Sequence, residues 1–238
     1  MVIFACNMSN SFFKFKQFTV WQDVCAMKVG TDGVLLGAWA EGGMRILDIG
    51  TGTGLVAMMM AQRFLSADVT AIDVEEGACN QARSNVQRSV FNERVSVFHE
   101  PLQQFSRGSY DAIVCNPPFF VDALECPDAS RSVARHASTL GYADLFAGVS
   151  RLLDDNGVFS AIIPFDCREK FEQAAVMSGL SVSRICAVKT TPRKQPRRYL
   201  LAFRKHPCNV ETAEECLCDA AGERSLWYRE LTKEFYLK

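Results

Sequence analysis

Segments that look like buried strands alternate with segments of helical pattern through most of the chain. Short apolar runs rich in β-branched residues are typical of parallel strands covered on both faces. Longer mixed segments between them are typical of helices. This alternation predicts an α/β fold, a doubly wound and mostly parallel sheet of seven strands with a short N-terminal appendage. We expect strands over 44–50, 68–74, 94–100, 110–116, 158–164, 181–190 and 197–205. We expect helices over 55–65, 75–89, 142–157 (closed by Gly157), 168–180 and 225–237.

Bulk composition excludes several classes of protein. The chain has 238 residues, 48% of them hydrophobic and 22% charged, which is typical of a globular domain. A net charge of −1 argues against a protein that binds along nucleic acid through its overall charge, but it allows a local basic patch. Ten cysteines occur without a C-x-x-C pair and with only three histidines, so we expect reduced thiols and no metal site. No uncharged apolar stretch approaches 18 residues, so we expect no membrane span and a cytoplasmic protein.

The chain divides into two regions of unequal size. Residues 1–40 include a hairpin pattern over 12–23, and we expect this region to cover a bound ligand. Residues 41–238 carry the alternating pattern, and we expect them to form a single globular unit. Met8 would also make a natural start, so residues 1–7 could be an extension. We expect a monomer or a weak homo-oligomer.

A glycine turn follows the first strand of the expected sheet. Gly50, Gly52 and Gly54 stand between that strand and a helix, where they allow a ligand to approach the backbone closely. The dinucleotide turn G-x-G-x-x-G has another spacing, which disfavours a nicotinamide-dependent oxidoreductase. Asp48 precedes the turn and would repel a pyrophosphate but suit an ammonium group. S-adenosylmethionine carries an ammonium and a sulfonium and no phosphate, so we expect it as the cofactor, with S-adenosylhomocysteine as the product.

A second acid ends the next strand. Asp73 lies about twenty residues after the turn, where a carboxylate accepts hydrogen bonds from ribose hydroxyls. The alternative is a structural turn in another kind of α/β protein.

The sequence Asn-Pro-Pro-Phe ends the fourth strand at 116–119. In a doubly wound sheet this strand lies beside the first, at the crevice where ligands bind. The side-chain oxygen of Asn116 and the carbonyl of Pro117 can accept the two N–H bonds of an exocyclic amine, which frees its lone pair for methylation. We also expect Asn116 to contact the cofactor. Phe119 offers a face on which a base can stack. The alternative is a rigid loop whose aromatic ring packs inward.

These motifs resemble those of class I S-adenosylmethionine-dependent methyltransferases, and among them the bacterial tRNA(Val) adenine-N6-methyltransferase family. The resemblance runs over nearly the whole chain from about Met8. It is carried by FKFKQFTVWQDVCAMKVGTDGVLLGAWA, DIGTGTG, NPPFF, ARH, PRRYLLAF and LTKEFYLK. It implies a Rossmann-like methyltransferase fold and transfer of a methyl group to N6 of the adenine just 3′ of the anticodon, position 37.

The resemblance also implies cofactor contacts before the sheet. Lys28, Thr31 and Asp32 should line the cofactor, although Thr31 or Asp32 could instead cap the helix that follows. The family pattern has an acid beside the cofactor's adenine where this chain has Pro101. The backbone of Leu102 is the candidate replacement.

Basic residues gather in two places that could contact RNA phosphates. The candidates are Arg131, Arg135, Arg193, Lys194, Arg197 and Arg198. A solvated basic turn and an ordinary hairpin are the alternatives. His136 lies near the first group, but the mechanism requires no general base.

Other functions remain open on the sequence. A guanine-N2 rRNA methyltransferase and a protein-glutamine N5-methyltransferase use the same or a related motif. The latter usually has a larger helical domain before the glycine turn. A nucleotide-binding scaffold without catalysis is the alternative of another class.

Overall fold

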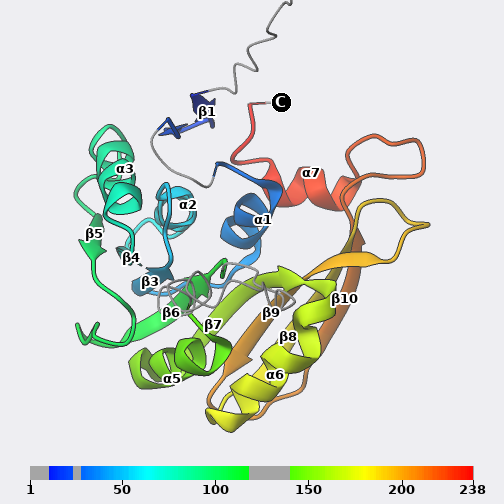
Figure 1. Cartoon of the computed structure of the whole chain (residues 1–238). Coiled ribbons are helices and arrows are strands. Elements are labelled where there is room, and N and C mark those ends of the chain that lie inside the picture. The colour runs from blue at the N-terminus through cyan, green and yellow to red at the C-terminus, as the bar shows by residue number, and fades with distance from the viewer. Residues whose placement is uncertain (1–10, 24–27, 118–139, 238) are drawn as a thin grey trace, which may run out of the picture.

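The computed structural model describes residues 11–23, 28–117 and 140–237. Within these ranges one large sheet of eight strands forms the centre, in the order β10-β8-β9-β7-β6-β3-β4-β5 (Figure 1). Its strands are β3 (Arg45–Ile49), β4 (Asp68–Asp73), β5 (Val95–His99), β6 (Tyr110–Cys115), β7 (Leu153–Pro164), β8 (Ser181–Lys189), β9 (Pro196–Arg204) and β10 (Glu211–Cys216). Strand β9 is antiparallel to both β7 and β8, and the other pairings are parallel. The predicted α/β fold is confirmed.

Helices cover the two faces of the sheet. Helices α1, α2 and α3 lie on one side, and α5 and α6 lie on the other (Figure 1). The helices are α1 (Thr31–Trp39), α2 (Leu55–Arg63), α3 (Glu76–Gln87), α5 (Tyr142–Leu152), the short 3₁₀ helix η1 (Phe165–Cys167), α6 (Arg168–Met177) and α7 (Leu226–Thr232). None of the helices in the described part of the chain has the length and apolar character needed to cross a bilayer.

Neighbouring residues of the central strands enter two separate cores. Ile46 packs in the core under α1 and α2, whereas Leu47 packs in the core under α5 and α6. Val114 and Ile113 of β6 divide in the same way. Successive side chains of a strand point to opposite faces, so a strand covered on both faces must be apolar throughout. This is the physical reason for the continuous apolar runs in the sequence.

The N-terminal residues join the first of these cores. Strands β1 (Phe12–Lys14) and β2 (Thr19–Trp21) form the expected antiparallel hairpin. The buried ring of Phe15 stacks on Tyr236, and the backbone N–H of Lys16 donates to the carbonyl of Phe235 at 2.8 Å. The two ends of the described chain therefore pack against each other.

Three details differ from the sequence prediction. The last helix, expected over 225–237, is the shorter α7 and ends at Thr232. Helix α5 ends at Leu152, so Gly157 is not its terminal signal and lies inside β7. A Cβ at Gly157 would lie 2.7 Å from Cδ1 of Leu153 and 3.1 Å from the carbonyl oxygen of Asp111, which explains the glycine by close packing. All seven predicted strands are present, and β10 adds an eighth at the edge. Its sequence ETAEEC is polar and largely exposed, so it carries no apolar alternation that would predict a strand.

Candidate active site

The glycine turn connects the end of β3 to α2. All three of its glycines have positive φ angles, 69° at Gly50, 55° at Gly52 and 81° at Gly54. A Cβ at Gly50 or Gly52 would meet nothing within 4 Å, whereas one at Gly54 would lie 3.3 Å from Cβ of Ala82. The first two glycines therefore leave the backbone open to a ligand, and the third also lets the turn pack against α3.

Asp73, the last residue of β4, holds this turn from one side. Its Oδ2 accepts the backbone N–H of Gly52 at 2.9 Å, and its Oδ1 accepts the N–H of Glu75 at 3.0 Å. Each carboxylate oxygen has a second lone pair, so Asp73 can still accept from a ligand hydroxyl.

Asp48 holds the turn from beneath. It is 1% exposed, and its Oδ2 accepts from the hydroxyl of Thr51 at 2.7 Å and from the N–H of Ala57 at 3.1 Å. Burial raises the pKa of Asp48 from its ordinary value near 4 to about 7, although both hydrogen bonds oppose the shift and the charge of Asp73 adds to it. Asp48 thus binds the turn to the first turn of α2.

Asn116 stands beside the glycine turn. Strand β6 pairs with β3 in parallel with Ile49 opposite Cys115, so Gly50 and Asn116 follow at the same level on neighbouring strands. The Oδ1 atom of Asn116 is buried and has no hydrogen-bond partner among the residues that the structure describes. An unpaired buried carbonyl oxygen costs about 1–3 kcal/mol, so an atom in this state needs an explanation, and a donor from a bound ligand would provide one. Pro117 is also buried.

The residues expected to line the cofactor before the sheet surround the start of α1. Lys28 and Thr31 are exposed. Asp32 forms an ion pair with Arg198 of β9, with 2.8 Å between Oδ2 and Nε. The N-cap residue of α1 is Gly30 and no side chain caps it, so the alternative cap by Thr31 or Asp32 is wrong.

After β5, at the position where an acid beside the cofactor's adenine was expected, the available groups are those of the backbone. Leu102 packs in the core, and its carbonyl accepts Nη2 of Arg151 at 2.8 Å. Glu100 pairs instead with Arg107, with 3.3 Å between Oε2 and Nη2.

The basic loop predicted to contact RNA lies at the same edge of the sheet. Strand β8 ends at Lys189 opposite Pro196, and Arg198 is opposite Pro164 at the carboxyl end of β7. Arg193, Lys194 and Arg197 are exposed there. The predictions for Phe119, Arg131, Arg135 and His136 fall outside the described residues.

Sequence reasoning missed one residue of this region, Asn85 of α3. It is fully buried, and it accepts the N–H of Trp21 at 2.9 Å. It donates to the carbonyls of Trp21 at 2.8 Å and of Thr53 at 2.9 Å. Asn85 therefore ties the N-terminal hairpin to the glycine turn. A polar residue on the apolar stripe that includes Ala78 and Ala82 was the signal that could have found it.

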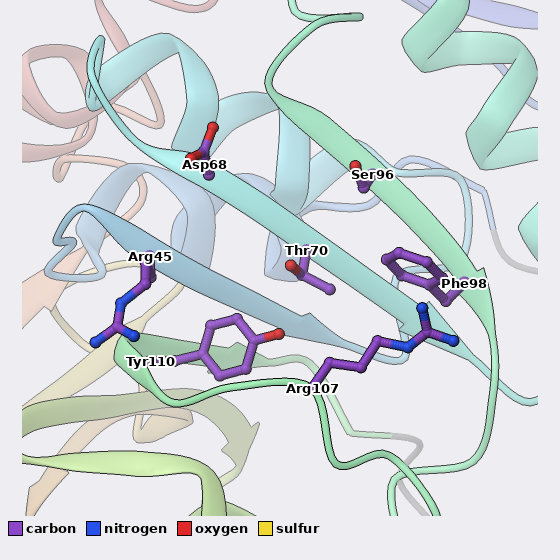
Figure 2. Close-up of a pocket in the computed structure, with 7 residues that line it drawn as sticks. All are labelled: Arg45, Asp68, Thr70, Ser96, Phe98, Arg107 and Tyr110. Carbon is purple, nitrogen blue, oxygen red and sulfur yellow. The ribbon is translucent and has the colours of Figure 1, made fainter.

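A separate hollow of about 300 Å³ lies away from this site (Figure 2). Its lining includes Arg45, Asp68 and Tyr110, which begin β3, β4 and β6, so it opens near the amino ends of these strands. Arg107 extends over the ring of Phe98 beside it, 4.2 Å from the ring centroid. None of the predicted site residues lines this hollow.

Comparison with known proteins shows relatives that match nearly the whole chain. A curated tRNA1(Val) (adenine(37)-N6)-methyltransferase of Bacteroides fragilis is 49% identical over 97% of this chain and 100% of its own length. The chain belongs to this methyltransferase family. The protein of the same name from Bacteroides thetaiotaomicron is 48% identical over 97% of this chain and 99% of its own length.

Residues 29–140 match the family described as methyltransferase small domain. The crystal structure of a predicted O-methyltransferase from Agrobacterium tumefaciens superposes with a TM-score of 0.68 at 17% identity, over 86% of this chain and 96% of the other. At this identity the likeness concerns the fold, which is that of methyltransferases.

Substitution of Asn85 by Ala should lower the free energy of unfolding by about 3 kcal/mol, because it leaves partly buried backbone groups of Trp21 and the buried carbonyl of Thr53 unpaired. Urea unfolding measures the change. Asn80→Ala on the exposed side of the same helix is the control and should change it by less than about 0.5 kcal/mol. Equal losses in the two variants would contradict the role of Asn85.

The raised pKa of Asp48 predicts a pH-dependent stability. Between pH 5 and pH 7 the unfolded chain has lost this proton while the folded protein holds it, so the free energy of unfolding falls as the pH rises toward about 7. Asp48→Asn lacks this contribution. The unfolding free energy of Asp48→Asn minus that of the wild type should therefore increase by about 2 kcal/mol from pH 5 to pH 7. A difference that stays constant over this range in urea unfolding would show that the pKa is not raised.

Proposed function

We propose that the protein transfers a methyl group from S-adenosylmethionine to the exocyclic N6 of an adenine in tRNA, at position 37 next to the anticodon of a valine tRNA. The observation that carries the proposal is the buried Oδ1 of Asn116 at the level of the glycine turn, which no donor among the described residues reaches. The names of the relatives supply the base and its position.

The residues around the turn fit S-adenosylmethionine, which supplies an activated methyl group on a positively charged sulfur. Gly50 and Gly52 leave the backbone open on the side away from the protein interior. Asp73 keeps lone pairs for the ribose hydroxyls while it fixes the N–H of Gly52. Asp48 acts through the turn, and a nearby positive charge would favour its ionised form.

Contacts at the two ends of the cofactor complete this assignment. We assign Lys28, Thr31 and Asp32 to its side nearest α1, where the ion pair between Asp32 and Arg198 fixes the start of the helix. The backbone N–H of Leu102 is our candidate for the adenine moiety, since its carbonyl is engaged by Arg151.

Asn116 then acts on the second substrate. Its Oδ1 accepts one N–H of the exocyclic amine, and the carbonyl of Pro117 accepts the other. Withdrawal of both N–H bonds from the plane of the ring makes the nitrogen lone pair available for the methyl group. The nitrogen loses its extra proton after transfer, so no strong base is needed. Positioning of the two substrates provides most of the rate. Phe119 completes the proposal as the stacking face for the base.

A tRNA substrate is compatible with the charge distribution. The net charge of the chain is −1, but Arg193, Lys194 and Arg197 are exposed at the edge of the sheet that carries Asn116. We propose that these side chains contact phosphates, together with Arg131 and Arg135. The anticodon loop is unpaired, so its bases reach a pocket at lower cost than bases of a duplex. With this substrate we place the enzyme in the cytoplasm, as a monomer or weak homo-oligomer.

Substitution of Asn116 by Ala should reduce methyl transfer by at least about a hundredfold, because the amine loses an acceptor that acts in the transition state. Affinity for S-adenosylhomocysteine should stay within about threefold, since the asparagine acts mainly on the base. Nucleoside mass spectrometry of an unmodified tRNA transcript measures the product, and calorimetry measures the affinity.

The control for this substitution is the exposed Asn209→Ala, which should methylate like the wild type. Turnover by Asn116→Ala near the wild-type rate would remove Asn116 from the mechanism. A wild-type product of N2-methylguanosine instead of N6-methyladenosine would favour the guanine-N2 alternative.

Asp73→Asn should weaken S-adenosylhomocysteine binding by about tenfold, because an amide makes a weaker acceptor than a carboxylate for the ribose hydroxyls and the Gly52 N–H. Asp68→Asn at the other end of the same strand is the matched control. Calorimetry compares the two affinities. If Asp73→Asn binds as tightly as Asp68→Asn, then Asp73 does not contact the cofactor.

A further inference from the structure

A pair of stacked aromatic rings, one exposed and one buried, stands at the end of β7. Phe165 is 38% exposed, and its ring stacks on that of Tyr199 with centroids 5.4 Å apart and an interplanar angle of 18°. The guanidinium of Arg168 lies 4.8 Å from the centroid of the Tyr199 ring. Glu172 holds Arg168 in place, with 2.6 Å between Oε1 and Nε. We call Phe165, Tyr199 and Arg168 the aromatic platform.

The core does not require Phe165. The core on this face of the sheet already has a cluster of buried phenylalanines, among which Phe146 and Phe171 have centroids 4.7 Å apart. Phe165 instead presents much of its ring to solvent. An aromatic ring that is held by a second ring and left exposed is the arrangement on which unpaired bases stack.

The platform is close to the candidate active site along the sheet. Strand β7 lies next to β6 (Figure 1). The two strands pair in parallel with Ala161 opposite Cys115, so Ile162 is level with Asn116. Phe165 follows three residues later, about 10 Å further along the strand direction. It therefore rises from the same edge as Asn116, one strand away.

Basic side chains border the platform on its other side. Tyr199 follows Arg198 in β9, and the exposed Arg197, Lys194 and Arg193 precede it in the chain. Asp166 is an exposed acid beside Phe165, so the charge at the platform itself is mixed and the net positive charge lies in the loop. An RNA strand that extends from the active site past the platform would bring its phosphates to this basic loop.

We propose that the aromatic platform stacks an unpaired RNA base that is a neighbour of the target adenine, with Phe165 as the contacting ring. This inference rests on the proposed function. It adds a contact that positions the substrate strand without sequence readout, because every base has a face that can stack.

The test replaces a neighbour of the target adenine by fluorescent 2-aminopurine, on the 5′ side in one tRNA transcript and on the 3′ side in another. Wild-type protein should quench the fluorescence of one of them. Phe165→Leu keeps an apolar contact with Tyr199 but should lose the quenching and bind RNA about tenfold more weakly. Phe165→Trp should retain both. The rate at saturating RNA should stay within about twofold in each variant, since the platform acts on binding.

The salt dependence separates stacking from contact with phosphate. Phe165→Leu should leave the slope of log affinity against log salt unchanged, whereas Arg193→Gln should reduce its magnitude by about 0.7 and keep the quenching. Met177→Ala, which removes an exposed apolar side chain from the far end of α6, is the matched control and should bind like the wild type.

Three outcomes would overturn the inference. They are unchanged affinity and quenching in Phe165→Leu, a changed salt slope in that variant, and an equal loss in Met177→Ala. If the wild type forms N6-methyladenosine while any of these holds, only the inference fails. If the wild type methylates no tRNA, the proposed function fails, and the inference fails with it.

Discussion

The parallel pairing of β3 with β6 is the interaction on which the candidate site depends. These strands are separated in the chain by two helices and two strands, yet Ile49 stands opposite Cys115. The pairing brings Gly50 and Asn116 to the same level, about 5 Å apart across the sheet. Strand β4 lies on the other side of β3, and α2 and α5 lie on opposite faces of the sheet (Figure 1). The carboxyl ends of β3 and β6 are therefore a topological switch point, where sheets of this kind usually bind ligands.

The glycine turn beside this crevice is held by side chains from three directions. Asp73 holds it from the neighbouring strand, Asp48 from beneath and Asn85 from α3. A turn of three glycines has high conformational freedom in the unfolded chain, so fixing it requires several contacts. Asn85 also fixes Trp21, which makes the N-terminal hairpin part of the same assembly. Asp48 is deeply buried and has a strongly raised pKa, which couples this assembly to pH.

Much of this arrangement could be predicted from the sequence, and the failures have physical reasons. Central strands such as β3 and β6 were predictable because burial on both faces requires continuous apolar residues. Strand β10 was not predictable, because it is specified by its pairing with β8 at the edge of the sheet. Its polar sequence has no apolar alternation that would indicate a strand. Gly157 was misread because a glycine that avoids a packing clash and a glycine that ends a helix look alike in the chain.

By itself, the sequence determined the α/β class, the glycine turn and the order of the polar residues that end the strands. These properties follow from local periodicity and from backbone angles that only certain residues adopt. The tertiary structure alone decided that the oxygen of Asn116 is buried without a partner in the described part of the chain, that Asp32 pairs with Arg198, and that Asn85 joins the hairpin to the turn. The reason is that hydrogen bonds and ion pairs between distant segments depend on distances of a few ångströms, which are set only when the sheet and its helices have packed.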